Sequence, residues 1–186
     1  MVCVDIYIIK HADTSWNEVK KTQGHCDVEL SEMGIKKAIL LSGKKEIQTV
    51  KAIYSSDLKR AYQTIEPLAK KIDIPIIKLV GLREGNWKRY NIDSRYPPLA
   101  FEGGYEDNQM LRKRGILIMK KIVEQSLDTP ILIVTHGSFL DYFIESISFK
   151  GNVPLKIRRV ALNHIQYNQG VWKIIKLNDV AHLGGN

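Results

Sequence analysis

Two histidines stand where the sequence changes from apolar to polar residues. The apolar run IYII (residues 6–9) is followed by Lys10 and His11, and the run ILIVT (residues 131–135) is followed by His136 and Gly137. An imidazole can act as a nucleophile, a proton carrier or a metal ligand. In open α/β sheets the loops converge beyond the carboxyl ends of the strands, and sites form there. We therefore expect His11 and His136 to share one pocket.

The elements that would hold this pocket follow from the hydrophobic pattern. Apolar runs rich in β-branched residues indicate buried strands at residues 2–9, 52–54, 75–80 and 130–135. Residues 159–167 and 171–177 flank Asn168-Gln169-Gly170 and indicate a hairpin, with Gly170 at positive φ. Strands alternate with helical segments, so the pattern predicts an α/β three-layer sandwich with a mostly parallel sheet, an antiparallel edge and helices on both faces.

Helical spacing of apolar residues predicts four helices. The first begins after Ser31 and the second after Ser56 or Asp57. The third spans residues 105–126 and the fourth residues 139–147. Ser31 is the expected N-cap of the first, and Ser56 or Asp57 of the second. Pro67 is expected to kink the second helix or to mark a break in it. The expected apolar residues are Ile35, Ala38, Ile39 and Leu41 in the first helix, and Met110, Leu111, Ile118, Met119 and Ile122 in the third.

Composition favours one ordinary globular domain over residues 1–186. The chain is 44% apolar and 26% charged, and it contains no linker-like stretch. No apolar run approaches the roughly 18 residues that a membrane span needs, and the first residues read poorly as a signal peptide. These observations predict a cytoplasmic protein without a membrane partner.

The net charge of +8 favours anionic partners through the summed field, and this sign suits phosphorylated metabolites and nucleic acid alike. Basic and aromatic residues alternate in NWKRYNIDSRY (residues 86–96), but no nucleic-acid-binding module accompanies them. We expect a lid or substrate-selecting loop there, and no nucleic-acid partner.

Six segments in order resemble one known family. They are KHADTSWN, QGHCDVELSEMG, YSSDLKRAYQT, LREGNW, VTHGSF and LNDVAHL, and they span nearly the whole chain. This series is similar to that of the histidine phosphatase superfamily, also called the phosphoglycerate mutase-like family. The resemblance implies the fold predicted above and a phosphoryl-transfer activity that needs no metal or other cofactor.

The resemblance also implies roles for individual residues. His11 matches the nucleophile that becomes a phosphohistidine, and Arg60 matches an arginine that clamps the phosphate. Glu84 matches the acid that protonates the leaving oxygen, and His136 the second histidine in contact with the phosphoryl group. The matching substrate-binding positions are Asn17, Gln23, Gly24 and Gly137. His25, His164 and His182 are expected to be structural.

The sequence departs from the family in one tripeptide, because Lys10-His11-Ala12 stands where Arg-His-Gly is usual. Lys10 keeps the positive charge of a catalytic position but loses a bidentate contact, at a cost of about 1.5–3 kcal/mol. The methyl group of Ala12 is expected to restrict a positive φ or to crowd the backbone near the phosphate. We expect reduced activity rather than none.

Three alternatives remain open. His11, Asp13, Glu84 and His136 could hold a metal in a hydrolase, although no metal-type spacing supports this reading. A weakened phosphate-binding or regulatory protein could use the same fold. A mutase could too, but mutases of the family are usually longer near the acid, so the short segment after Glu84 favours a phosphatase. The expected partner is a small phosphorylated substrate; the sequence predicts neither which phosphomonoester it is nor an oligomeric state.

Overall fold

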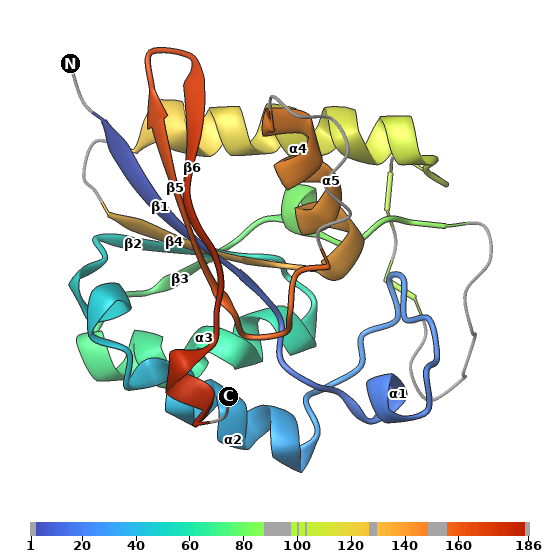
Figure 1. Cartoon of the computed structure of the whole chain (residues 1–186). Helices are drawn as coiled ribbons and strands as arrows, with labels where there is room; N and C mark the ends of the chain where they lie inside the picture. The colour runs from blue at the N-terminus through green and yellow to red at the C-terminus, as the bar shows by residue number, and fades with distance from the viewer. Residues whose placement is uncertain are drawn as a thin grey trace.

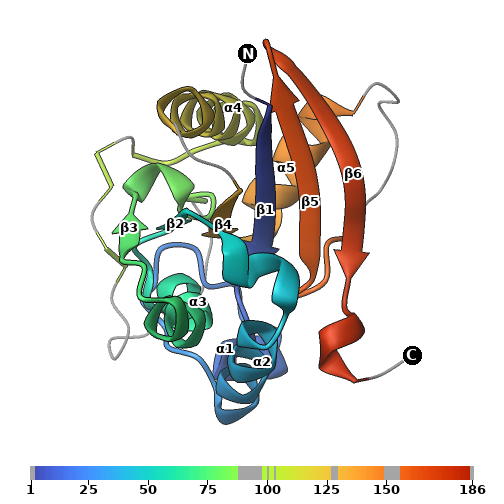
Figure 2. The same cartoon turned by 90° about the vertical axis from the view of Figure 1, so that its left-hand side faces the viewer.

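A twisted sheet forms the centre of the protein (Figures 1 and 2). The computed structural model describes residues 3–87, 98–99, 101–102, 104–126, 130–148 and 156–184. Within these residues the six-stranded sheet has the order β3-β2-β4-β1-β5-β6. The strands are β1 (Val4–Lys10), β2 (Ala52–Ser55), β3 (Ile76–Lys78), β4 (Ile131–Thr135), β5 (Leu162–Asn168) and β6 (Val171–Asp179). All pairs among the first four strands are parallel, whereas β5 pairs antiparallel with both β1 and β6. This pairing confirms the predicted α/β sheet with an antiparallel edge.

Helices cover both faces of this sheet, with α2 and α3 together on one side and α4 and α5 on the other (Figure 1). The helices are α1 (Ser15–Glu18), α2 (Glu32–Ser42), α3 (Lys59–Ile72), α4 (Asn108–Gln125) and α5 (Gly137–Ile147). Three 3-10 turns, η1 (Lys45–Thr49), η2 (Val80–Leu82) and η3 (Ala181–Leu183), complete the described elements. No helix among the described residues has the length and apolar character that crossing a membrane requires.

β4 shows how the sequence builds two apolar cores. All five of its residues are buried. Ile131 and Ile133 join the core under α4 and α5, whereas Leu132 and Val134 join the core under α2 and α3. Successive side chains of a strand point to opposite faces, so a continuous apolar run supplies both cores.

The central pair β1 and β4 also brings the two predicted histidines to one edge. Lys10 is in register with Thr135, and the backbone N–H of His11 donates to the Thr135 carbonyl at 2.9 Å. His11 and His136 therefore follow adjacent strands at the same level.

At the other end of the chain, Gly170 in the β5–β6 hairpin has φ +85°, as its sequence predicts.

The helix that carries Arg60 begins differently from the prediction. The N-cap of α3 is Leu58, and no side chain of its own turn caps the helix. Instead the Asp27 carboxylate, from a distant loop, accepts the Lys59 N–H at 2.7 Å, and Asp57 is occupied by an ion pair with Arg83 at 2.6 Å. The predicted caps are thus wrong because a tertiary contact replaces them. α3 also continues through Pro67, so of the predicted kink or break the break is wrong.

The predicted apolar face of α2 is correct only in part. The Ser31 side chain caps this helix through the Gly34 N–H, as predicted. Ala38 and Leu41 are buried, but Ile35 and Ile39 are 49% and 56% exposed, respectively. Leu111, Met119 and Ile122 of α4 are buried as predicted, whereas Met110 is exposed. The lid predicted over residues 86–96 lies outside the described residues from position 88 onward.

Replacement of Leu68 by alanine tests the core between α3 and the sheet. Leu68 is fully buried, so Leu68→Ala should lower the free energy of unfolding by about 2–5 kcal/mol through lost burial and a residual cavity. Leu117 of α4 is 58% exposed, and Leu117→Ala should change it by less than about 0.5 kcal/mol. Urea unfolding of both variants measures the difference, and equal effects would contradict the described packing.

Candidate active site

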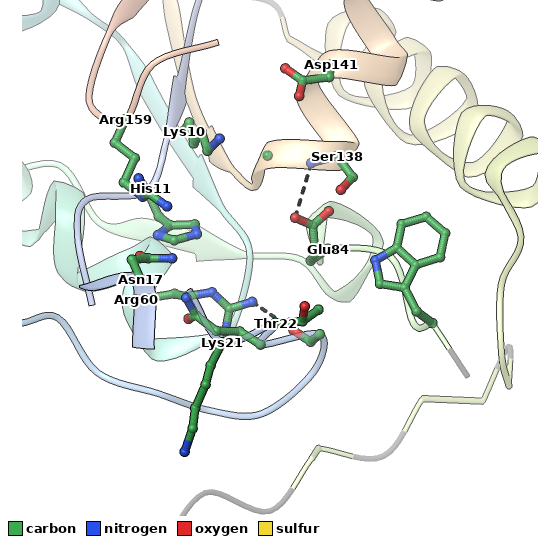
Figure 3. A pocket seen from close by; sticks show the side chains of 14 residues that line it. Lys10, His11, Asn17, Lys21, Thr22, Arg60, Glu84, Ser138, Asp141 and Arg159 are labelled. Atoms are coloured by element: carbon green, nitrogen blue, oxygen red, sulfur yellow. Dashed lines mark hydrogen bonds between the residues drawn. The ribbon is translucent and has the colours of Figure 1, made fainter. Parts of the chain in front are cut away.

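A cavity of about 240 Å³ opens at the carboxyl ends of β1 and β4 (Figure 3). It is polar and basic. Its lining includes eight of the predicted residues, namely Lys10, His11, Asn17, Gln23, Gly24, Arg60, Glu84 and Gly137. The remaining predicted residue, His136, packs beside His11 but does not line the cavity. Segments that are far apart in the sequence thus meet here, but the prediction that His136 shares this pocket with His11 is wrong, because the ring of His136 is fully buried.

His11 is held in one tautomer. Its Nδ1 lies 2.7 Å from the Ala12 carbonyl oxygen, and a carbonyl can only accept, so Nδ1 carries the proton. Nε2 is then the unprotonated nitrogen. Burial, and after it the charge of Arg60, lowers the pKa of His11 well below its usual value. A neutral imidazole with a free lone pair on Nε2 is the form that can act as a nucleophile.

His136 lies directly beside His11. The two ring centroids are 5.2 Å apart. His136 is fully buried, and neither of its ring nitrogens has a hydrogen-bond partner among the described residues. Burial and the charge of Arg60 lower its pKa as well, so this ring is also neutral. Buried polar atoms without partners are uncommon in folded proteins, and these nitrogens have bonding capacity left for a ligand.

Arg60 brings a positive charge into the buried base of the site. It is 1% exposed and comes from the first turn of α3. Its Nη1 and Nη2 donate to the carbonyls of Cys26 and Gly24, each at 2.8 Å, while its Nε has no partner among the described residues. Burial lowers the pKa of Arg60 to about 10, so it stays charged at neutral pH. Neutral carbonyls orient this cation without cancelling its charge, which leaves it able to attract an anion.

The Glu84 carboxylate is held at the beginning of α5. Its Oε2 accepts the Ser138 N–H (Figure 3) and its Oε1 accepts the Phe139 N–H, both at 3.1 Å. These N–H groups belong to the first turn of the helix, where no intrahelical acceptor is present. α5 begins at Gly137, the residue after His136, so the helix that follows His136 also fixes Glu84.

Lys10 fits between two backbone segments. Its Nζ donates to the Ile157 carbonyl at 3.3 Å, and burial lowers its pKa. A Cβ atom at Gly137 would lie 2.9 Å from the Lys10 Nζ and 3.6 Å from Glu84 Oε2. The glycine thus makes room for both the ammonium and the carboxylate.

Ala12 causes none of the expected backbone strain. Its φ is not in the positive region, and its N–H donates to Thr64 Oγ1 at 2.9 Å. Its methyl group is fully buried in the core under α2 and α3. The strain predicted for this position is wrong because the alanine adopts an ordinary conformation and its side chain points into the core.

The loop after β1 supplies the polar wall next to His11 (Figure 3). Asn17 Oδ1 accepts from both the N–H and the hydroxyl of Thr14, each at 3.1 Å, so its amide nitrogen is the group left for a ligand. Gln23 is buried, with its Oε1 unpartnered among the described residues. Gly24 has φ +46°, a conformation that favours glycine.

Sequence reasoning missed five residues of the lining: Lys21, Thr22, Ser138, Asp141 and Arg159. A further lining residue, Trp87, falls in the segment 86–96, which is predicted to be a lid or substrate-selecting loop. Asp141 follows Gly137 by one helical turn, so the helical period could have found it. Its carboxylate accepts the Ile157 N–H at 3.2 Å, and burial raises its pKa. Arg159 precedes β5 in a segment without a recognisable motif, and only the fold brings it beside His11.

Two side chains hold the backbone that carries Glu84. The Nε2–H of His25 donates to the Glu84 carbonyl at 2.9 Å. From α4, Arg114 donates to the carbonyls of Gly81, Arg83 and Glu84 and forms an ion pair with Glu106. His25 is structural as predicted, but its partner is the backbone of the predicted acid.

The described residues contain no group of three or more His, Cys, Asp or Glu side chains arranged to hold a metal ion. His11, Asp13, Glu84 and His136 do not form the cluster that the metal reading requires. The donors directed at the cavity are instead nitrogen groups, which suit an anion.

The site and the fold together define an α/β protein with a neutral histidine in a basic cavity at the carboxyl edge of the sheet. The model of the histidine phosphatase superfamily (branch 1) matches residues 6–180, and the chain belongs to this family. It is a histidine-phosphatase-type enzyme.

Relatives of known name fall into two groups. A metal-independent phosphoserine phosphatase of Arabidopsis thaliana is 29% identical, over 96% of this chain and 83% of the relative. A probable phosphoglycerate mutase GpmB of Yersinia pestis is 24% identical, over 97% and 95%. Among solved structures, Bacillus stearothermophilus YhfR superposes with a TM-score of 0.83 at 24% identity, over 97% of this chain and 99% of that one.

Replacement of His25 tests the pH dependence that these buried histidines impose. Burial lowers the pKa of His25 to about 4, whereas in the unfolded chain it is about 6.5. Below pH 6.5 the unfolded chain therefore binds more protons, so stability falls as the pH falls. Gln keeps a side-chain N–H donor but does not titrate, so in His25→Gln the loss of unfolding free energy between pH 7.5 and 5.5 should be smaller by about 1 kcal/mol. Urea unfolding at the two pH values measures it; an unchanged loss would contradict the assigned burial.

Proposed function

We propose that the protein is a metal-independent phosphomonoesterase that acts on a small phosphorylated metabolite through a phosphohistidine at His11. One observation carries this proposal: the bond from His11 Nδ1 to the Ala12 carbonyl leaves Nε2 unprotonated, in a ring that lines the cavity next to Arg60. The relatives that are named phosphatases support it.

In the first step His11 Nε2 attacks phosphorus, and the bond from phosphorus to the ester oxygen breaks. Arg60, with the Asn17 amide and Lys10, offsets the negative charge on the equatorial oxygens. His136 lies beside His11, but its ring is fully buried and does not line the cavity, so no step is assigned to it. Glu84, in its protonated form, gives its proton to the leaving oxygen, and the alcohol departs.

In the second step Glu84, now a carboxylate, takes a proton from water while the water oxygen attacks phosphorus. The bond from phosphorus to Nε2 breaks, inorganic phosphate leaves, and His11 and Glu84 return to their starting forms. Burial favours a neutral His11 between turnovers, which keeps the nucleophile available without a metal.

A mutase is the second candidate, because relatives named phosphoglycerate mutase cover nearly the whole chain. A mutase must protect its phosphohistidine from water until the acceptor arrives. Only about twenty residues separate Glu84 from Tyr105, which favours hydrolysis over transfer. Release of inorganic phosphate without a second phosphorylated product distinguishes the two activities.

Replacement of the nucleophile is the direct test of this mechanism. His11→Ala should lower kcat/KM for phosphomonoesters by at least about a thousandfold, because it removes the imidazole on which the proposed intermediate forms. Wild-type protein, quenched with alkali during turnover, should carry one phosphoryl group on the peptide that contains His11. His164→Ala, which alters a histidine outside the cavity, should retain activity within about twofold. Inhibition of the wild type by EDTA would support a metal-dependent hydrolase instead.

Replacement of Lys10 tests whether its ammonium group assists the reaction. Lys10→Met keeps the length of the stem and removes the charge, so kcat/KM should fall about ten- to a hundredfold. Lys10→Arg should retain or raise it, because a guanidinium can make two bonds to phosphate oxygens. If the wild type hydrolyses no phosphomonoester in a broad panel and Lys10→Arg stays inactive, the weakened phosphate-binding reading replaces the enzyme.

A further inference from the structure

A second cavity adjoins the candidate active site. It has a volume of about 550 Å³ and lies between the loop after β1, helix α2 and the segment that precedes β5. We call it the basic groove; its lining consists of Lys10, Asp13, Asn17, Lys20, Lys37, Lys156, Ile157, Arg158, Arg159 and Leu183. Lys10, Asn17 and Arg159 also line the first cavity, so one ligand could contact both.

The charge of the basic groove is strongly one-sided. Six cationic side chains and one carboxylate line it. That carboxylate, Asp13, is already bound, because its Oδ2 lies 2.8 Å from Lys37 Nζ and its Oδ1 lies 3.8 Å from Arg159 Nη1. Positive charge is therefore in clear excess in the basic groove. Cations that line one groove favour the binding of an anion there.

Three of the cations have no anionic partner of their own. Within the described part of the chain, no carboxylate lies within ion-pair distance of Lys20, Lys156 or Arg158. Arg158 is nevertheless fixed through its backbone, since its N–H donates to the Asn178 side chain at 2.8 Å. The backbone carbonyl of Lys156 accepts from the same asparagine. The backbone around the two cations is thus anchored while their side chains remain available.

Arg159 lines both cavities, and Figure 3 shows it beside His11 in the first one. Its Nε is a buried atom without a hydrogen-bond partner among the described residues. Its guanidinium lies next to His11, where a phosphoryl group in the first cavity would bind, and it also faces the basic groove. A ligand that extends from the phosphate position into the basic groove would pass Arg159 and could accept a hydrogen bond from its Nε–H.

We propose that the basic groove is a second anion subsite, in which Lys20, Lys156 and Arg158 bind a further phosphate or carboxylate of the same substrate. The inference rests on the proposed phosphomonoesterase activity and narrows its substrate class to phosphomonoesters with a second anionic group. A neutral remainder of the substrate would leave these cations unpaired, so such compounds bind more weakly.

Binding to a protein that cannot turn over tests the subsite separately from catalysis. The parent is His11→Ala, and the probes are glycerol 3-phosphate and 3-phosphoglycerate, which differ by a hydroxymethyl group in place of a carboxylate. Fructose 6-phosphate and fructose 1,6-bisphosphate form the matching pair for a second phosphate. Calorimetry should show at least about tenfold tighter binding of the doubly anionic member of one pair, and the pair that shows it identifies the second group.

The double replacement Lys156→Met and Arg158→Met removes two cations at exposed positions. In the same parent it should reduce the preference to less than about threefold, while the affinity for the singly anionic probe changes less than twofold. Lys120→Met with Lys121→Met, on α4 and outside both cavities, should leave the preference intact. Equal affinity for both members of each pair, or a preference that survives the double replacement, would overturn the subsite.

Wild-type kinetics with the same four compounds separate the two proposals. A preference in calorimetry without any phosphate release would retain the subsite and reject the phosphomonoesterase. Hydrolysis of glycerol 3-phosphate and 3-phosphoglycerate with equal kcat/KM, together with equal affinities, would retain the enzyme and reject the subsite.

Discussion

The candidate site depends on one buried cation. Arg60 is held by the carbonyls of Gly24 and Cys26, which are neutral and fix its orientation without forming an ion pair. Burial and the charge of Arg60 together keep His11 and His136 neutral, so the guanidinium proposed to clamp the phosphate also protects the proposed nucleophile from protonation. A carboxylate in place of either carbonyl would satisfy Arg60 and weaken both effects. The loop after β1 therefore contributes through its backbone as much as through its side chains.

Much of this arrangement could be predicted because it depends on local patterns. Continuous apolar runs identify β1 and β4, and their parallel pairing places His11 and His136 at one edge. The family resemblance adds Arg60 and Glu84, which the structure places in the same cavity. Most predicted residues of the site therefore meet as expected.

The errors have a common physical origin in contacts between distant segments. Asp27 caps α3 across more than thirty residues of sequence, so Ser56 and Asp57 looked like better caps than they are. Ile35 and Ile39 match the helical period of a buried face, yet α2 packs through Gly34, Ala38 and Leu41. The close approach at Gly34 decides this orientation, because a Cβ atom there would lie 2.1 Å from the Asp13 carbonyl oxygen. The helical spacing of apolar residues in the sequence does not predict such a contact.

The register between β1 and β4 has a consequence for how the protein acquires its site during synthesis. His11 directly follows β1, and its backbone partner Thr135, at the end of β4, is synthesised far later. β1 occupies a central position in the sheet, between β4 and β5, so its neighbours on both sides come from the second half of the sequence. Pairing of this kind carries a large loop-closure entropy and forms slowly. His11 is thus synthesised long before it can be placed, and a nascent chain has no partial site until β4 has been synthesised.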